Sequence, residues 1–214
     1  MTIWFLTTNP GKVDEAREYF SKHGIPVRQL EIEASEPQAD DLEAVALSKI
    51  EQALPHLPNP DDMLLVEDAG LFVDALNGFP GVYSAYVLET LDVHGILKLM
   101  DHLQSEDPIQ DGNLRSAEFR SVAALYKNGQ TIVAEGVCPG RIAHEPVMGE
   151  GFGFDPIFIP ADLDEDGNSL AIGEIGAKST HGKPFGGIPL AEKQQYSHRH
   201  RALENLLSNL DRLG

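Results

Sequence analysis

Two adjacent carboxylates, Glu67 and Asp68, follow directly on the short apolar run Met63 to Val66. This run predicts a buried strand, and successive side chains of a strand point to opposite faces, so only one of the pair is expected to face a cleft. A carboxylate at the end of a strand can hold Mg²⁺ or deprotonate an attacking water. An isolated pair of this kind is also compatible with two solvated acids at a strand–loop junction.

A second candidate is the turn Thr7-Thr8-Asn9-Pro10-Gly11-Lys12, which separates an expected strand from an expected helix. At such a turn, backbone N–H groups and the helix dipole point at one spot, which favours binding of a phosphate. Lys12 adds a full positive charge in the first helical turn. Many turns of this type bind nothing, so the turn gives only a weak signal when it is taken alone.

Glycines and aromatic residues alternate in the segment from Gly149 to Pro156. Glycines on both sides of Phe152 allow a flat ligand to approach its ring, and stacking of a nucleobase on such a ring contributes about 1–3 kcal/mol. Asp155 can then accept hydrogen bonds from the base or the ribose. The alternative is an aromatic core strand with glycine bulges.

The polar run from Glu192 to Arg201 contains His198 and Arg199 side by side. A histidine ring and a guanidinium can together donate hydrogen bonds to a carbonyl oxygen on the edge of a base. The alternative is that the run is simply the polar start of a last helix.

Two other patterns do not predict a site. The segment from Gly176 to Pro184 resembles a P-loop, but it has five intervening residues, and Pro184 stands where the Mg²⁺-binding hydroxyl would be. The eight histidines show no metal-ligand spacing, so no zinc is expected.

Composition limits the possible partners. The chain has 214 residues, with 16 Lys and Arg against 34 Asp and Glu, a formal net charge of −18 that repels nucleic acid and anionic lipid. No apolar run approaches the roughly 20 residues that span a bilayer, so no membrane contact is expected. The N-terminal stretch lacks a basic leader and is expected to form a first strand. The single cysteine, Cys138, fits a reducing cytoplasm. The acidic surface fits either an ordinary cytoplasm or a salt-rich one, in which salt screens the repulsion between like charges.

The elements that must position these residues alternate between strand and helix early in the chain, and a hairpin follows. The expected strands are 2–8, 63–66, 119–126, 131–137 and 156–159. Helices are expected where apolar residues share one face, over 13–20, 42–54, 91–100 and 203–210. Asn128-Gly129 is a strong hairpin turn signal, because both residues tolerate positive φ. The pattern predicts an α/β fold with a mixed sheet. The acidic loop 161–168 and the glycine-rich stretch 173–187 are interpreted as exposed insertions.

The four candidate segments, in their order along the chain, resemble the inosine-triphosphatase family, also called the Ham1-like or RdgB-like non-canonical purine NTP pyrophosphatases. The matching stretches are TTNPGKVDEAREYF, VEDAGLFVDALNGFPGVYSAY, GRIAHEPVMGEGFGFDPIFIP and EKQQYSHRHRAL, which span nearly the whole chain. The resemblance implies an elongated mixed α/β fold, with residues 1–214 as a single domain of two lobes around a central active-site cleft. It also implies a homodimer, Mg²⁺ as cofactor, and hydrolysis of ITP, dITP and XTP to monophosphate and pyrophosphate.

The resemblance also implies roles for individual residues. Asp68 matches the general base and a metal ligand, Glu36 looks like the acidic Mg²⁺ residue, and Glu67 is possible metal support. Four residues are expected to hold the phosphates: Thr8, Asn9, Lys12 and Lys49. Phe152 should stack on the base, beside a wall of Gly153, Phe154 and Asp155. The residues expected to recognise the purine and close over it are Lys193, Ser197, His198 and Arg199.

The chain departs from the family pattern at three places. Ala69 stands where many members have serine, and Gln194 stands where asparagine is usual. The stretch from Gly176 to Pro189 looks like an insertion, which affects the placement of Lys193.

The expected reaction is attack on the α-phosphorus by a water that Asp68 orients or deprotonates, and pyrophosphate then leaves with its charge held by lysines and metal. Inosine and xanthosine bases present a carbonyl at the six-position, whereas adenine presents an amino donor that a site of donors rejects. Nothing in the sequence explains how guanine is excluded. Two alternatives stay open: a broader or modified-pyrimidine nucleotide pyrophosphatase, and a non-catalytic nucleotide-binding regulatory module.

Overall fold

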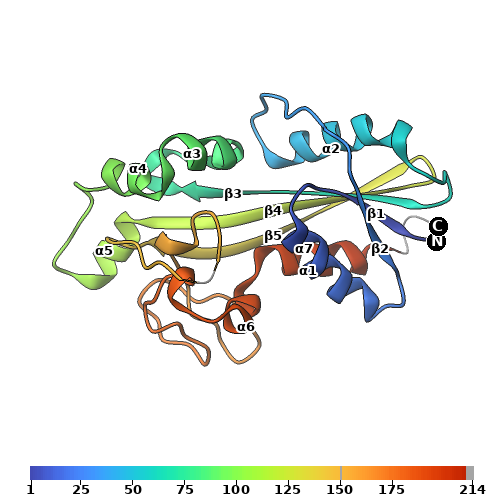
Figure 1. Ribbon diagram of the computed structural model, residues 1–214. Coiled ribbons are helices and arrows are strands. Elements are labelled where there is room, and N and C mark those ends of the chain that lie inside the picture. Colours follow the sequence, from blue (N-terminus) through green and yellow to red (C-terminus); the bar gives the residue numbers. More distant parts are fainter. Residues whose placement is uncertain (150, 211–214) are drawn as a thin grey trace. The chain divides into compact units, whose positions relative to one another are not determined.

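The computed structural model describes residues 1–149 and 151–210, so Glu150 of the glycine–aromatic segment lies outside the described residues. Its strands form a six-stranded sheet in the order β2-β1-β3-β4-β5-β6 (Figure 1). The strands are β1 (Ile3–Leu6), β2 (Val27–Leu30), β3 (Met63–Val73), β4 (Ser116–Lys127), β5 (Gln130–Ile142) and β6 (Phe158–Pro160). β1 pairs in parallel with β2 and with β3, whereas β5 pairs antiparallel with β6. The prediction of a mixed sheet in an α/β fold is therefore confirmed.

The chain divides into two compact units. Unit 1 contains residues 1–69, 121–136 and the residues from Arg199 onward, and unit 2 contains residues 70–120 and 137–198. The helices are α1 (Pro10–Ser21), α2 (Leu42–Ala53), α3 (Ser84–Thr90), α4 (Asp92–Leu99), α5 (Pro108–Leu114), α6 (Leu190–Lys193) and α7 (His198–Ser208). Among the described residues, no helix is both long enough and apolar enough to cross a membrane.

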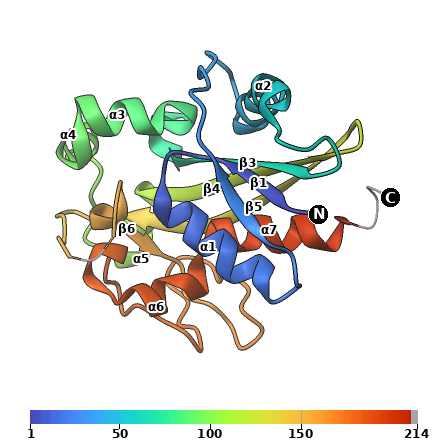
Figure 2. The same ribbon diagram turned by 45° about the vertical axis from the view of Figure 1, so that its right-hand side comes forward.

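Unit 1 places helices on both faces of its strands. In both views α1 and α7 lie together on one face and α2 lies on the other (Figures 1 and 2). Apolar side chains of α1, α7 and the strands form one hydrophobic core, which includes Phe5, Phe20, Leu65 and Leu203. This packing fixes the position of the turn before α1 and of the polar start of α7.

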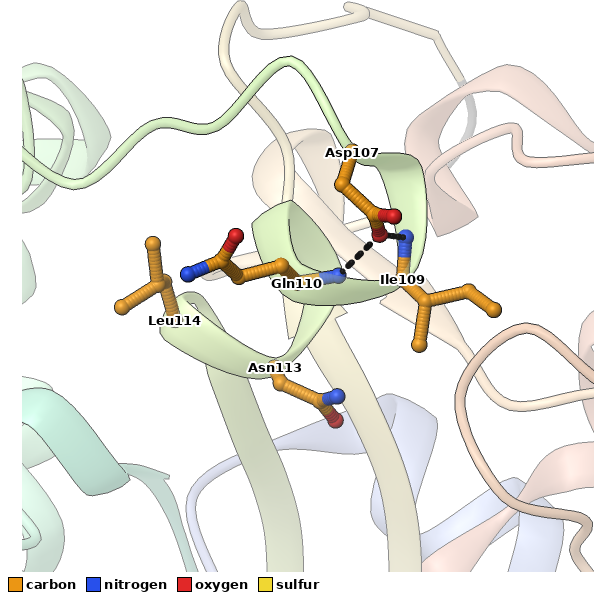
Figure 3. A pocket seen from close by; sticks show the side chains of 5 residues that line it. All are labelled: Asp107, Ile109, Gln110, Asn113 and Leu114. Atoms are coloured by element: carbon orange, nitrogen blue, oxygen red, sulfur yellow. Dashed lines mark hydrogen bonds between the residues drawn. The ribbon is translucent and has the colours of Figure 1, made fainter.

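Unit 2 has its own core, in which aromatic residues are prominent. Phe119, Phe154, Phe158, Phe185 and Tyr196 are all buried there. Asp107 caps the start of helix α5: its Oδ1 accepts hydrogen bonds from the backbone N–H groups of Ile109 and Gln110, both at 2.9 Å (Figure 3).

The hairpin prediction is also confirmed by the structure. Asn128 and Gly129 join β4 to β5 and have φ values of 50° and 83°, which is the geometry that this residue pair favours. The helix expected over 91–100 is confirmed as α4, and the shorter helix α3 before it was not predicted.

Two expectations about exposure and length were wrong. Strand β3 does not end at Val66 but continues to Val73, so Glu67 and Asp68 lie inside a strand. The stretch 173–187 is not simply an exposed insertion, because Thr180 and Phe185 in it are buried, at 2% and 1% exposure. Phe185 belongs to the aromatic core of unit 2, which ties this stretch to the fold.

Candidate active site

The turn before α1 is closed by its own side chains. Asn9 is the N-cap residue, and its Oδ1 accepts from the backbone N–H groups of Gly11 at 2.9 Å and Lys12 at 3.4 Å. The backbone N–H of Asn9 donates to Thr7 Oγ1 at 3.1 Å. The N–H groups that the sequence suggested for phosphate binding are thus capped by Asn9, because a helix start needs such a partner for its first donors.

Lys49 links two carboxylates of unit 1. Its Nζ lies 2.7 Å from Glu36 Oε1 and 3.4 Å from Asp68 Oδ2. Helix α2 positions Lys49 because Val45, Ala46, Ile50 and Ala53 bury the apolar side of the helix, and Asp41 caps its start. The Lys49 side chain is only 13% exposed, so the ammonium is held between the two acids.

Glu67 points to the other side of β3 and is fully buried. Its Oε2 lies 2.7 Å from Lys12 Nζ and 3.2 Å from Arg199 Nε, and its Oε1 accepts from Ser121 Oγ at 2.5 Å. Arg199 Nη1 also pairs with Glu15 Oε2 at 2.7 Å. Two acids and two bases thus form a compensated cluster, since a buried charge is stable only when it is paired and hydrogen-bonded.

These surroundings shift the pKa values of the neighbouring carboxyl groups Glu67 and Asp68 in opposite directions. Burial alone would raise the pKa of Glu67, but Arg199, Lys12 and the Ser121 hydroxyl outweigh it and hold that pKa well below its usual value. For Asp68, burial dominates and raises the pKa, although Lys49 and Lys12 oppose the shift. Burial would lower the pKa of Lys49, but its two carboxylate neighbours reverse this and raise it.

The donor set around Lys49 fits a hard divalent cation. Among residues 1–149 and 151–210, no group of three or more His, Cys, Asp or Glu side chains could hold a metal ion. Glu36 and Asp68, however, already share one cation, the Lys49 ammonium. Mg²⁺ in proteins is often bound by one or two carboxylates together with waters and substrate phosphates, so two carboxylates suffice when a triphosphate supplies the rest.

A second group of expected residues gathers in unit 2 around Asp155. Lys193 Nζ forms an ion pair with Asp155 Oδ2, and the backbone N–H of Phe152 donates to the same oxygen at 2.9 Å. The ammonium also lies 4.7 Å from the centre of the Phe152 ring. Phe152 is 51% exposed although it is a large apolar residue, whereas the Asp155 side chain is 5% exposed.

The glycine that precedes Phe152 is required by this arrangement. Gly151 has φ of 131°, and a Cβ at this position would lie 2.5 Å from Asp155 Oδ2. Any side chain would therefore disturb the carboxylate that orients both Phe152 and Lys193. The segment is thus built to hold an exposed aromatic ring in a fixed position.

The other residues of unit 2 that were expected to bind the base lie in different environments. The His198 ring stacks on Phe119, with centroids 5.1 Å apart and planes 18° apart. Gly153 follows Phe152 with φ of 65°. Phe154 does not form an open wall, because its side chain is 4% exposed and packs in the core.

Arg199 lies in a different environment from the one that the sequence suggested. Its guanidinium is 5% exposed and is bound to Glu15 and Glu67, so it points into unit 1. Sequence reasoning also missed Glu15 and Ser121. Glu15 stands one helical turn after Lys12, and Ser121 is a polar residue within an apolar strand, but neither position indicates its distant partner.

Two cavities of unit 2 lie away from these groups. One of about 490 Å³ lies beside α5, lined by Asp107, Ile109, Gln110, Asn113 and Leu114 (Figure 3). Another of about 360 Å³ is lined by residues that include Arg141, His144 and Val147. None of the residues expected to bind a nucleotide lines either cavity.

The fold and these side chains define a mixed α/β protein with a carboxylate–lysine centre and a separate aromatic–carboxylate group. The chain belongs to the Ham1 family, which matches residues 3–209. A dITP/XTP pyrophosphatase of Thermococcus kodakarensis is 41% identical over 203 residues, covering 95% of this chain and 94% of the relative. A dITP/XTP pyrophosphatase of Pyrococcus horikoshii is 42% identical, covering 86% and 92% of the two chains. The solved structure of the Staphylococcus aureus Ham1 protein matches with a TM-score of 0.72 and 26% identity over 100% of both chains.

Proposed function

We propose that this chain hydrolyses non-canonical purine nucleoside triphosphates, namely ITP, dITP and XTP, to the monophosphate and pyrophosphate. The observation that carries the proposal is the position of Asp68 and Glu36 on a shared lysine, with Lys12 close enough to influence the pKa of Asp68. Hydrolysis of a phosphoanhydride needs carboxylates for a metal and a water, and cations for the leaving phosphates. The two relatives named as dITP/XTP pyrophosphatases support the same reaction.

Residues of unit 1 serve the triphosphate end of the substrate. Lys12 and Lys49 neutralise phosphate oxygens, and Thr8 and Asn9 border the turn that carries Lys12. Glu36 and Asp68 would hold Mg²⁺, which would supply Lewis-acid polarisation of the phosphates. Lys49, which lies between the two carboxylates, would offer its charge to the phosphates.

Asp68 acts as the general base of this proposal. Burial raises its pKa, and a base is most effective when its pKa approaches the working pH. Its Oδ2 faces Lys49, while its Oδ1 accepts from the backbone N–H of Ala69 at 3.1 Å. This bond fixes the carboxylate plane, so that one oxygen can orient a water toward the α-phosphorus.

Residues of unit 2 bind the purine base of the substrate in this proposal. The exposed Phe152 ring stacks on the purine, and the Asp155–Lys193 pair offers both an acceptor and a donor beside it. Gly153 and Phe154 support this segment, and His198 with Ser197 offers donors to the carbonyl at the six-position. Arg199 assists through its anchoring of the start of α7, since its guanidinium is engaged by Glu15 and Glu67.

The test is a substrate panel with product analysis. Purified protein is incubated with ITP, XTP, ATP and GTP, with and without Mg²⁺, and pyrophosphate and orthophosphate are measured separately. We expect metal-dependent pyrophosphate from ITP and XTP alone. Asp68→Asn should remove nearly all turnover, whereas the exposed control Glu51→Gln on α2 should retain it.

Each other result selects a different function. Equal use of all four substrates indicates a broad pyrophosphatase, orthophosphate release indicates a phosphatase, and tight binding without turnover indicates a regulatory module. The homodimer and the cytoplasmic location remain part of the proposal, and light scattering at several protein concentrations tests the first of them.

A further inference from the structure

The carboxylate of Glu67 has no oxygen facing solvent. Its side chain is 0% exposed, and both oxygens are engaged: Oε2 by Lys12 and Arg199, and Oε1 by Ser121. Lys12 Nζ also donates to the backbone carbonyl of Glu67 at 3.3 Å, so the lysine holds on to this residue at two points. The position is therefore a buried ion-pair centre, in which Oε2 is held by its two cationic neighbours without a geometric hydrogen bond.

A metal ion is disfavoured at such a place for two reasons. Two of the three groups around the carboxylate are cations, and Mg²⁺ would meet their charge at short range. Mg²⁺ also keeps several waters, and the carboxylate is inaccessible to solvent. The next residue, Asp68, points to the opposite side of β3, is 17% exposed and meets Lys49, which also binds Glu36.

The cluster around Glu67 connects four elements of unit 1. Lys12 and Glu15 lie one turn apart on α1, Ser121 is on β4, Arg199 is in the first turn of α7, and Glu67 on β3 lies between them. Lys12 keeps 17% of its side chain exposed while its ammonium pairs with the buried Glu67 carboxylate. Arg199 directly follows Ser197 and His198 in the chain, so its anchoring limits where those two residues can lie.

We propose that Glu67 is a positioning residue, which holds Lys12 and Arg199 in the orientation that the substrate needs and does not bind the metal. This inference rests on the proposed function for the role of Lys12 toward phosphate. Pre-alignment of a binding group reduces the ordering that substrate binding must impose, and misplacement by about 1 Å can lower the rate about 100-fold.

The central experiment compares Glu67→Gln with Glu36→Gln. Glu67→Gln keeps the size of the side chain but removes its charge, so we expect KM for ITP to rise about tenfold or more, while the Mg²⁺ concentration for half-maximal activity stays within about twofold. Glu36→Gln should show the reverse, a clear increase in the Mg²⁺ requirement. Glu67→Asp keeps the charge and should recover part of the affinity, which a purely structural role would not predict.

Two further measurements do not depend on turnover. Titration of Mn²⁺ into nucleotide-free protein, followed by electron paramagnetic resonance, should give the same affinity for wild type and Glu67→Gln. Thermal unfolding of Lys12→Met, Glu67→Gln and the double variant should show that the two changes together lower the melting temperature by less than the sum of the single shifts.

The outcomes separate the inference from the proposed function. Weakened Mn²⁺ binding in Glu67→Gln, or a rise of about tenfold in its Mg²⁺ requirement with KM unchanged, overturns the positioning role. If Glu67→Gln does not fold, Ser121→Ala replaces it, because it removes one hydrogen bond and leaves all four charges in place. If the wild type releases no pyrophosphate, the proposed function fails, and the metal titration and the unfolding cycle still decide the role of Glu67.

Discussion

Replacement of Lys49 by methionine tests the electrostatics of the carboxylate centre directly. The change removes the ammonium that lies 2.7 Å from Glu36 and 3.4 Å from Asp68 and keeps a side chain of similar length. Asp68 then loses its strongest opposing charge, while burial and the neighbours Glu67 and Glu36 continue to favour its protonated form. We therefore expect the pKa of Asp68, already raised, to rise further.

The size of the effect follows from the distance. Two unit charges 3.4 Å apart in an effective dielectric of about 20 interact by about 5 kcal/mol, which is an upper limit because Lys12 and entering water compensate part of it. A loss of about 1.4 kcal/mol already corresponds to one pKa unit. An increase of at least about one unit in the pKa of Asp68 is thus the expected minimum.

The assay is a carbon-detected NMR titration of the Asp68 carboxyl in metal-free protein, with Lys98→Met as the control. Lys98 is exposed on α4 in unit 2, so its removal changes the net charge equally without touching the centre. A general base must be deprotonated, so the acid limb of the pH–rate profile should move to higher pH in Lys49→Met. An unchanged or lowered pKa of Asp68, in a variant shown to be folded by circular dichroism, would refute the reasoning.

Further predictions concern stability, metal and base. Arg115 is 2% exposed and donates to the carbonyls of Ile142, Met100, Leu103 and Ala143 at 2.8–3.0 Å, so Arg115→Met should destabilise the protein by about 3 kcal/mol or more in urea denaturation. Because the pKa of Glu67 is lowered on folding, its charge stabilises the fold above the usual value of 4.5, and the difference in unfolding free energy between wild type and Glu67→Gln should shrink as pH falls below that value. EDTA should abolish pyrophosphate release without changing the melting temperature, because Lys49 already balances Asp68 and Glu36. Phe152→Ala should raise KM for ITP about tenfold in steady-state kinetics with little change in melting temperature, since the ring is 51% exposed.

The parts of the fold that depend on neighbours in the chain were predictable. The Asn128-Gly129 turn and the apolar face of α2 both follow from spacing over a few residues, and both are as expected. Lys49 itself is not among the buried residues of α2, and its side chain keeps 13% exposure beside them.

The contacts of the charged residues were not predictable in the same way. Arg199 pairs with Glu15 across 184 positions, and Lys12 contacts Glu67 across 55 positions, so no local pattern could indicate either pair. The extension of β3 past Val66 also depends on contacts between residues that are distant in the sequence. A carboxylate normally ends a buried strand, but the partners of Glu67 neutralise its charge and allow the strand to continue.

The continuous course of β3 through both carboxylates makes the number of residues before them critical. Side chains alternate along a strand, so deleting one residue between Met63 and Val66 would exchange the faces of Glu67 and Asp68. Glu67 would then face Lys49, and Asp68 would face Arg199. Sequence drift in this strand can therefore change the identity of its apolar residues far more readily than its length, and insertions or deletions are expected to collect in the loops instead.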